Sequence, residues 1–288
     1  MPVQILQSYS HSDFEKLPLS VMHIHNHGNC ALHGHAFSEL VIVCHGSAVH
    51  VSPGGEYQLG AGDVFVLHGN QTHGYRNTAS FEIVNILFRM DDLALSLRDL
   101  EPLPGYQVLF TLEPQARENG VFNSRLRISA EQLARIKDRV SEMVIEQRTM
   151  PAGWQFSIVA QFMLIVSDLC RAYSELENPA MRSLMRLGDV IAYIHQHYAE
   201  EITLDDLARV ASMSRRTITR EFRNGLGVSP IDYLIRERVN HALDLLRYSD
   251  VTVTETAYRV GFQDSNYFTR KFHALVGHSP RDARKLNA

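Results

Sequence analysis

The sequence predicts an α+β protein of two domains. We expect a β-barrel with a helical hairpin over residues 1–178, and an all-helical domain with two helix-turn-helix units over residues 182–288. Three observations support this division. Residues 20–90 contain short β-rich runs separated by glycine, residues 129–175 contain two helical patterns, and the last third repeats the phrase Thr-Arg-x-Phe-x4-Gly-x-Ser-Pro at an offset of fifty residues.

The composition is that of a globular protein large enough for two cores. The chain has 288 residues, of which 45% are hydrophobic and 21% charged. The three cysteines form no Cys-x-x-Cys pair, so a reducing compartment fits. The first residues lack the basic and apolar regions of a leader, and no run approaches 18 apolar residues. We therefore expect a cytoplasmic protein that does not engage a membrane.

Charge and histidine are unevenly distributed between the two ends of the chain. Residues 180–288 have a net charge of +3, whereas residues 1–179 have −7, which together give the overall −4. Ten of the fifteen histidines lie in the first 73 residues. The basic end is also the end with the repeat, as expected for a domain that binds phosphate groups.

The barrel is predicted from regularly spaced short strands. They are residues 40–43, closed by His45-Gly46; residues 64–67, after a turn at Gly60-Ala61-Gly62; and residues 81–88. Residues 91–128 remain unassigned, because their prolines interrupt any long element.

Two helices should follow the barrel. Ser129 and Gln132 have the spacing of a capping box, and an apolar stripe runs from Leu133 to Val144. A Pro151-Ala152-Gly153 turn should lead into a helix over 154–173 that is apolar nearly all round. Such a helix must be buried on more than one side, either within the domain or at a homodimer interface. Residues 175–181 are the expected linker.

The first repeat predicts a helix-turn-helix unit. Thr203 should cap a helix over 204–210, and Ser214 should cap the second helix after a tight turn. Ile218 and Phe222 are the expected core positions. The outward-facing candidates for DNA contact are Arg215, Arg216, Thr219, Arg220 and Arg223. Four arginines on so short a helix repel one another unless they meet a polyanion, and this helix is the one that enters the major groove.

The second repeat predicts a matching unit. Its first helix should begin at Thr252, and Asp264 should cap the second. The candidate DNA-binding residues are Ser265, Asn266, Tyr267 and Arg270, since asparagine suits adenine and arginine suits guanine or phosphate. A helix from Ser229-Pro230 to about Arg247 separates the units. Its length of about 28 Å approaches the ~34 Å of one DNA turn, so both units can read one duplex face. Alternatively, one unit reads bases and the other only packs or contacts phosphates.

Residues 184–286 resemble the DNA-binding domain of the AraC/XylS family of bacterial transcription activators. The phrase from Thr252 through Gly261-Phe262-Gln263-Asp264 to Gly277-His278-Ser279-Pro280 carries this resemblance. It implies regulation at a promoter operator and recruitment of RNA polymerase.

The histidine-rich region resembles a cupin barrel. His-x-His-x3-Glu-x6-Gly begins at His33, and a second phrase runs from Gly62 to His73. By this resemblance, the candidate ligands are His33, His35, Glu39 and His73. They suit Zn, Ni, Fe or Mn. Three interpretations stay open: a bound metal, a metal-free pocket whose side chains bind a polar effector, or structural residues only. His23-x-His25-x-His27 should share one strand face at a solvated surface.

The barrel and hairpin together are similar to the sensor half of sugar-responsive AraC-type regulators. Residues 31–46 are specifically like the L-rhamnose operon regulators. The resemblance predicts a homodimeric regulator, most simply an activator, that binds a sugar such as L-rhamnose and is not an enzyme. The alternatives are a metal-dependent cupin enzyme or a metal sensor, each fused to a DNA-binding domain.

Overall fold

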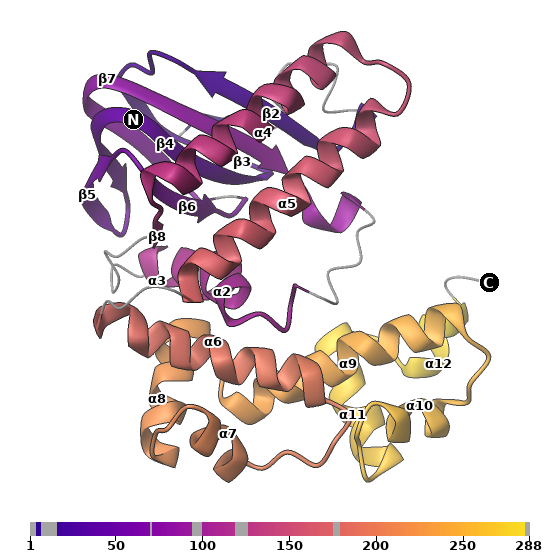
Figure 1. Ribbon diagram of the computed structural model, residues 1–288. Helices are drawn as coiled ribbons and strands as arrows, with labels where there is room; N and C mark the ends of the chain where they lie inside the picture. The colour runs from indigo at the N-terminus through magenta and orange to yellow at the C-terminus, as the bar shows by residue number, and fades with distance from the viewer. Residues whose placement is uncertain are drawn as a thin grey trace. The chain divides into compact units, whose positions relative to one another are not determined.

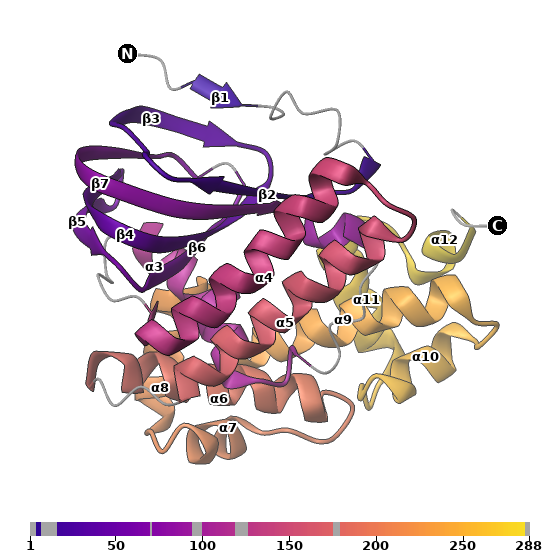
Figure 2. The ribbon, with the colours of Figure 1, turned by 45° about the horizontal axis from the view of Figure 1, so that its top comes forward.

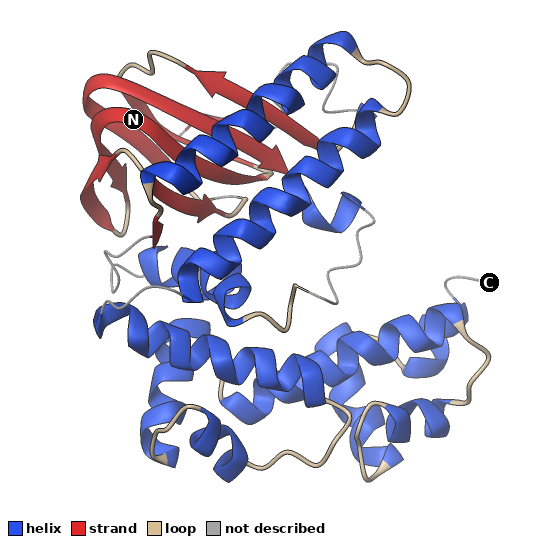
Figure 3. Ribbon diagram, viewed as in Figure 1, coloured by secondary structure: helices blue, strands red, loops and turns tan. Residues whose placement is uncertain are grey.

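The computed structural model describes residues 4–6, 16–69, 71–93, 100–118, 126–174 and 179–285. They belong to two compact units, Met1–Met185 and Arg186–Ala288. The first unit contains the strands, and the described part of the second is helical (Figure 3). This confirms the predicted fold class. The division falls inside helix α6 (Pro179–His197) instead of in the expected linker, of which residues 175–178 lie outside the described ranges.

The N-terminal unit is built on one eight-stranded sheet (Figure 1). Its strands are β1 (Gln4–Leu6), β2 (Leu19–Ile24), β3 (Cys30–His35), β4 (Ser38–Ser52), β5 (Gly55–Gly60), β6 (Asp63–Leu67), β7 (His73–Phe88) and β8 (Leu126–Arg127). The order along the sheet is β1-β3-β7-β4-β6-β8, while β2 also pairs with β7 and β5 with β4. The long strands β4 and β7 pair from Ser38↔Phe88 to Val51↔Gly74 and form its spine.

Both long strands bend midway, and the sheet folds over on itself (Figure 2). Their register shifts between Val43 and Val49. On one side of the bend β4 pairs with β6, and on the other side it pairs with β5. The predicted end of the strand at Gly46 is therefore wrong. Gly46 has a φ of 74°, and a Cβ there would lie 2.1 Å from the carbonyl oxygen of Ser80, so glycine allows β4 to bend and continue.

The bend gives the barrel an inner face filled by apolar and aromatic side chains from both halves. This inner cluster consists of Val41, Val43, Ala48, Tyr57, Leu59, Phe65, Leu67, Tyr75, Phe81 and Ile83. Because side chains alternate along a strand, Leu40 and Ile42 point to the outer face. They are fully buried all the same, since the helical hairpin covers that face.

The hairpin consists of α4 (Ala130–Thr149) and α5 (Trp154–Ser174). The predicted capping box of Ser129 and Gln132 is confirmed, as is the turn before Trp154. Gln147 of α4 attaches the hairpin to the barrel through two hydrogen bonds with the backbone of Val21, which donates at 2.9 Å and accepts at 3.3 Å.

The segment that the sequence left unassigned contains short helical elements. They are η1 (Met90–Leu93), α2 (Pro104–Gln107), the π-helical η2 (Val108–Leu112) and α3 (Glu113–Glu118). Pro104 stands at the first position of α2, where a proline begins a helix instead of breaking it.

The C-terminal unit contains the two predicted helix-turn-helix units. After α6, the helices are α7 (Leu204–Val210), α8 (Arg215–Leu226), α9 (Pro230–Tyr248), α10 (Val253–Arg259), α11 (Ser265–Val276) and α12 (Pro280–Lys285). Thr203 and Thr252 cap the first helices, and Ser214 and Asp264 cap the second. Both second helices end at a left-handed glycine. The sequence repeat is thus a structural repeat.

Helix α9 is the predicted 19-residue spacer, and it holds both units. Its apolar face enters a core with Phe268 and Phe272 of α11. At the edge of this core, Arg238 lies over the ring of Phe262 and donates to the carbonyl oxygens of Tyr198 and Glu200, both at 2.7 Å, in the loop after α6. Gly261 closes against the same loop, because a Cβ there would lie 2.8 Å from the Tyr198 oxygen.

Gly46→Ala should lower the free energy of unfolding of the N-terminal unit by about 2–5 kcal/mol, because it adds a steric clash to an unfavourable φ. Gly55→Ala is the matched control in the same sheet. It also has positive φ, at 132°, but has nothing within 4 Å of a new Cβ. Urea unfolding followed by circular dichroism measures both. Equal losses for the two variants would show that close packing at the bend is not what requires Gly46.

Candidate functional site

Helix α8 presents the basic side chains predicted for DNA contact. Ile218 and Phe222 are fully buried, so the opposite side of the helix faces the solvent. Arg215, Arg216, Arg220 and Arg223 are exposed and Thr219 is half-buried. These five residues therefore lie on the accessible part of a helix positioned as the second of a helix-turn-helix unit.

The four arginines differ in how they are held. Arg215 forms a bidentate ion pair with Asp205 of α7, and Arg220 pairs with its neighbour Glu221 at 2.8 Å. Among the described residues, neither the Arg216 nor the Arg223 side chain makes a hydrogen bond or an ion pair, although the Arg223 carbonyl accepts from Gly227 at the end of the helix. These two are the arginines most readily available to an anionic partner, because they break no internal ion pair to reach it.

Helix α11 presents a less basic surface. Phe268 and Phe272 are buried, while Asn266, Tyr267 and Arg270 are exposed and Ser265 is half-buried. The guanidinium carbon of Arg270 lies 5.9 Å from the centre of the Tyr267 ring. An exposed amide and an arginine stacked beside an aromatic ring can contact bases or the sugar-phosphate backbone.

Inside the barrel, three of the four predicted ligands converge. His35 Nε2 lies 3.0 Å and His73 Nε2 3.5 Å from Glu39 Oε2. All three residues are at most 3% exposed. Burial and the neighbouring histidines lower the pKa of His73 well below its usual value, so its imidazole is neutral at pH 7.

His33 does not join this group. Its Nδ1 lies 3.0 Å from the carbonyl oxygen of Ala31 and 3.4 Å from Cys30 Sγ, although its ring centre is 4.4 Å from that of His73. The strand spacing does place His33 opposite His73, and His33 to His35 keep a regular register with β1. His33 stays outside the group because its Nδ1 is engaged by Ala31 and Cys30.

The convergent group fits a divalent metal ion. Two imidazoles and a carboxylate place donor atoms within 4.8 Å of one another, and this donor set suits Zn, Ni, Fe or Mn. In the described part of the chain, neither nitrogen of His73 has a hydrogen-bond partner. His35, Glu39 and His73 would hold such an ion, which would supply a positive charge beside the inner cluster.

A cavity of about 90 Å³ opens next to this group. It is lined by His50, Ser52, Pro53, Leu67, Gln71, Thr72, Pro114 and Arg117. His50 joins the cavity to the convergent group, since its ring stacks 5.6 Å from the ring of His73. None of the four predicted ligands lines the cavity itself. Sequence reasoning missed His50, Gln71 and Arg117, because they come from three segments that only the folded sheet brings together.

Arg117 is the most strongly constrained residue of this cavity. It is 5% exposed and pairs with Glu113 at 3.2 Å, and its guanidinium lies over the rings of Phe65 and Tyr57. Burial opposes its charge, but the Glu113 carboxylate holds the pKa of Arg117 above its usual value. Tyr173 of α5 donates to the same carboxylate at 2.5 Å. A buried chain of three polar groups thus links the cavity to the hairpin.

A second, more open hollow of about 460 Å³ lies elsewhere on the N-terminal unit. It is bordered by Phe37, His68, Phe88, Arg89, Tyr106 and Phe110, among others. Arg89 forms an exposed ion pair with Asp92 at its edge, at 2.8 Å. Its polar groups belong to the surface, so it lacks the buried charge that marks the first cavity.

Among the described residues, one helix is long and apolar enough to cross a membrane by length and composition. It is α5, over Trp154–Tyr173, and 44% of this stretch is buried inside the protein. The core helix of a globular domain passes the same test.

Comparisons with known proteins match both units. The family model described as "AraC-like ligand binding domain" matches residues 21–147, and that described as "Helix-turn-helix domain" matches residues 207–286. The HTH-type transcriptional activator RhaS of Shigella boydii serotype 18 is 31% identical over 255 residues, covering 88% of this chain and 87% of that protein. RhaS of Escherichia coli O1:K1 is 32% identical over the same shares. The crystal structure of the DNA-binding domain of AdpA in complex with a target DNA matches 35% of this chain and 91% of that one, with 38% identity and a TM-score of 0.34.

Arg216→Ala and Arg270→Ala should each weaken binding to a preferred DNA sequence by about 1–3 kcal/mol and relax the preference at one base position. Arg209→Ala is the control, since Arg209 is exposed but belongs to α7 and pairs with Asp206 at 3.1 Å. Fluorescence anisotropy, with DNA that the full chain selects from a random pool, measures all three. If Arg209→Ala is as damaging as the others, α8 and α11 are not the reading helices.

Proposed function

Since the chain belongs to the AraC family of transcriptional regulators, we propose that its barrel binds a sugar and thereby controls how its two helix-turn-helix units engage a promoter. Family membership makes the chain a DNA-binding transcriptional regulator with a ligand-binding domain. The identity of the effector, the dimer, the contact with RNA polymerase and the residues at each site belong to the proposal.

The observation that carries the effector proposal is the cavity of about 90 Å³ in the ligand-binding domain, whose lining includes the buried side chains of His50 and Arg117. His50, Gln71 and Arg117 offer imidazole, amide and guanidinium groups within one small enclosure. Sugar hydroxyls both donate and accept hydrogen bonds, so they suit such a mixed set. Leu67, Pro53 and Pro114 of the same lining offer apolar surface for the C–H groups of a sugar. L-rhamnose is the first candidate because of the likeness to RhaS.

We propose that the signal leaves the cavity through Arg117. A sugar hydroxyl that bonds to Arg117 competes with Glu113, and Glu113 is also the partner of Tyr173 on α5. The pKa of Tyr173 is raised well above its usual value by burial and by Glu113, so its hydroxyl stays a proton donor. A change at Arg117 therefore alters how α5 is held, and binding can favour one of two arrangements of the protein.

We propose that the hairpin also forms a homodimer. Phe156 and Leu164 of α5 are 80% and 46% exposed and lie eight residues apart, hence on one side of the helix. Ile145 of α4 is 54% exposed. Large exposed apolar side chains on a helix whose other face is buried in the domain mark a surface that a second copy can cover.

The remaining parts of the proposal follow from this role. A regulator acts where the chromosome is, so we place the protein in the cytoplasm, and we propose activation through contact with RNA polymerase. A sensor must release its ligand unchanged, so we propose no catalytic activity. A metal-responsive regulator is the second candidate function, because His35, Glu39 and His73 can hold an ion beside the cavity.

The effector proposal predicts that L-rhamnose raises the thermal stability of the full chain, by about 2.7 kcal/mol at 100 times its dissociation constant. His50→Phe keeps the ring but removes both nitrogens, and should weaken this sugar at least tenfold. His45→Phe, the same change at an exposed position of the same strand, should leave binding intact.

Thermal unfolding with a panel of monosaccharides, before and after chelation, measures these effects. No response to any sugar, combined with a large loss of stability on chelation, would replace the sugar sensor by the metal-responsive regulator.

The dimer proposal predicts that Phe156→Glu gives a monomer, because it buries a charge at the interface. Tyr248→Glu is the matched control, since Tyr248 is 84% exposed but lies at the end of α9. Light scattering gives the mass of each variant. A dimer that survives Phe156→Glu places the interface elsewhere.

A further inference from the structure

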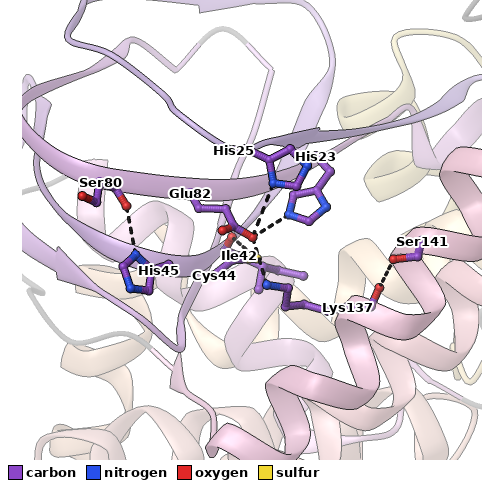
Figure 4. Close-up of polar contacts among 9 residues, drawn as sticks. All are labelled: His23, His25, Ile42, Cys44, His45, Ser80, Glu82, Lys137 and Ser141. Atoms are coloured by element: carbon purple, nitrogen blue, oxygen red, sulfur yellow. Dashed lines mark hydrogen bonds and ion pairs between the residues drawn. The ribbon is translucent and has the colours of Figure 1, made fainter.

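A second group of metal-binding side chains lies on the outer face of the barrel, beside α4 (Figure 4). His23, Cys44 and Glu82 place a nitrogen, a sulfur and a carboxylate oxygen within 4.8 Å of one another. His23 Nε2 lies 2.8 Å and His25 Nδ1 3.9 Å from the same oxygen of Glu82. The rings of His23 and His25 lie 4.1 Å apart.

The strand register explains why these residues meet. His23 of β2 pairs with Val84 of β7, and Ile42 of β4 pairs with Val84 from the other side. Glu82 is two residues before Val84 in β7, and Cys44 is two residues after Ile42 in the antiparallel strand β4. Both side chains therefore lie on the same face of the sheet as His23, next to each other at the start of the bend. The predicted solvated face of three histidines holds only for His25: His23 is largely buried beside it, and His27 packs against Tyr75 and Phe81 instead. Only the side chain of His25 is strongly exposed, at 74%, against 15% for His23.

We propose that His23, His25, Cys44 and Glu82 bind a divalent transition-metal ion, best Zn²⁺, on the outer face of the barrel. Zinc takes four ligands from cysteine, histidine and carboxylate, and structural sites use all four positions. Donor atoms around one tetrahedral zinc lie roughly 3.4–3.6 Å apart, so His23, Cys44 and Glu82, which lie within 4.8 Å of one another, need only to close by about an ångström. His25 lies outside this group, with Nδ1 3.9 Å from Glu82, and its exposed side chain would have to turn inward to supply the fourth ligand. With four protein ligands the site keeps no open position, and its role is to hold or sense the ion instead of performing catalysis.

In the structure, the ammonium group of Lys137 on α4 is the positively charged partner of Glu82, the role that the metal ion would take. Its Nζ lies 2.9 Å from Glu82 Oε1. His23 Nε2 lies 2.8 Å from the same oxygen, so Glu82 already directs one oxygen at both an imidazole and an ammonium. A dication would replace the ammonium as the partner of Glu82, and Lys137 is long and 38% exposed, so it can turn into solvent. Binding would therefore exchange one attachment of α4 to the sheet for a metal centre.

The geometry separates this site from the convergent group inside the barrel. Cys44 is 7% exposed and faces the hairpin, whereas His35, Glu39 and His73 face the interior. The inner group has a cysteine of its own nearby, Cys30, whose sulfur lies 3.4 Å from His33. Substituting Cys44 therefore tests the outer site, and substituting Cys30 is the control for the inside of the barrel. The proposal does not depend on which effector the cavity binds.

Co²⁺ titrated into the metal-free, reduced full chain tests the proposal. Cobalt replaces zinc in such sites and reports on its ligands, because a thiolate ligand gives a charge-transfer band and tetrahedral geometry gives intense visible bands. We expect both in the wild-type protein, with Zn²⁺ displacing the cobalt and removing the bands. Cys44→Ser should abolish the charge-transfer band and weaken binding more than roughly a hundredfold, whereas Cys30→Ser should change neither.

Two surface variants keep the test informative if Cys44→Ser folds poorly. Glu82→Gln should lower Co²⁺ affinity. Lys137→Met should raise it by about three- to tenfold, because the competing ammonium is gone. A purely structural ion pair predicts no thiolate charge-transfer band in any variant, whereas cobalt bound only by His35, Glu39 and His73 would give visible bands without it. Absence of the charge-transfer band in the wild-type chain, its survival in Cys44→Ser, or unchanged affinity in Lys137→Met would overturn the proposal.

Discussion

The bend in β4 and β7 is the constraint on which the N-terminal unit depends. Gly46 fits beneath the carbonyl oxygens of Ala79 and Ser80 at a distance that no side chain permits. Because the two strands continue through the bend, a single sheet supplies both walls of the barrel. The inner wall then encloses the buried histidines, Glu39 and the polar cavity. The outer wall receives the hairpin, and the second group of metal-binding side chains lies where the bend begins.

The C-terminal unit is organised around a different constraint, the attachment of two reading helices to one rigid spacer. Helix α9 shares its core with α10 and α11, and Arg238 and Gly261 close on the loop that leads into the first helix-turn-helix unit. Both second helices therefore pack against one spacer, an arrangement with which we propose that they enter successive grooves of one duplex. Their chemistry differs, since α8 carries four exposed arginines and α11 offers an amide, a tyrosine and one arginine. Unequal contributions to affinity follow from this difference.

The sequence predicted local structural features well, but it predicted contacts between residues far apart in the chain poorly. The capping box at Ser129, the turn before Trp154 and the duplicated units depend on neighbours in the chain, and all are confirmed. The role of Gly46 was misjudged, because a glycine that follows a β-rich run can mark either the end of the strand or a bend within it. The Arg117–Glu113–Tyr173 chain was missed, since Tyr173 lies sixty residues from Glu113, and both Glu113 and Arg117 stand in a segment with no clear periodicity. His23 was assigned to solvent because nothing local reveals that Cys44 and Glu82 stand beside it.

The central claim is that the cavity and the DNA-reading helices are coupled. Such coupling is reciprocal, so a sugar that changes DNA affinity must itself bind with a different affinity when DNA is present. The most direct measurement is calorimetric titration of L-rhamnose into the full chain, alone and with saturating amounts of its selected DNA. The account predicts a severalfold difference between the two dissociation constants, equal to the change in DNA affinity that the sugar causes. Sugar binding of the same affinity in both titrations would contradict it.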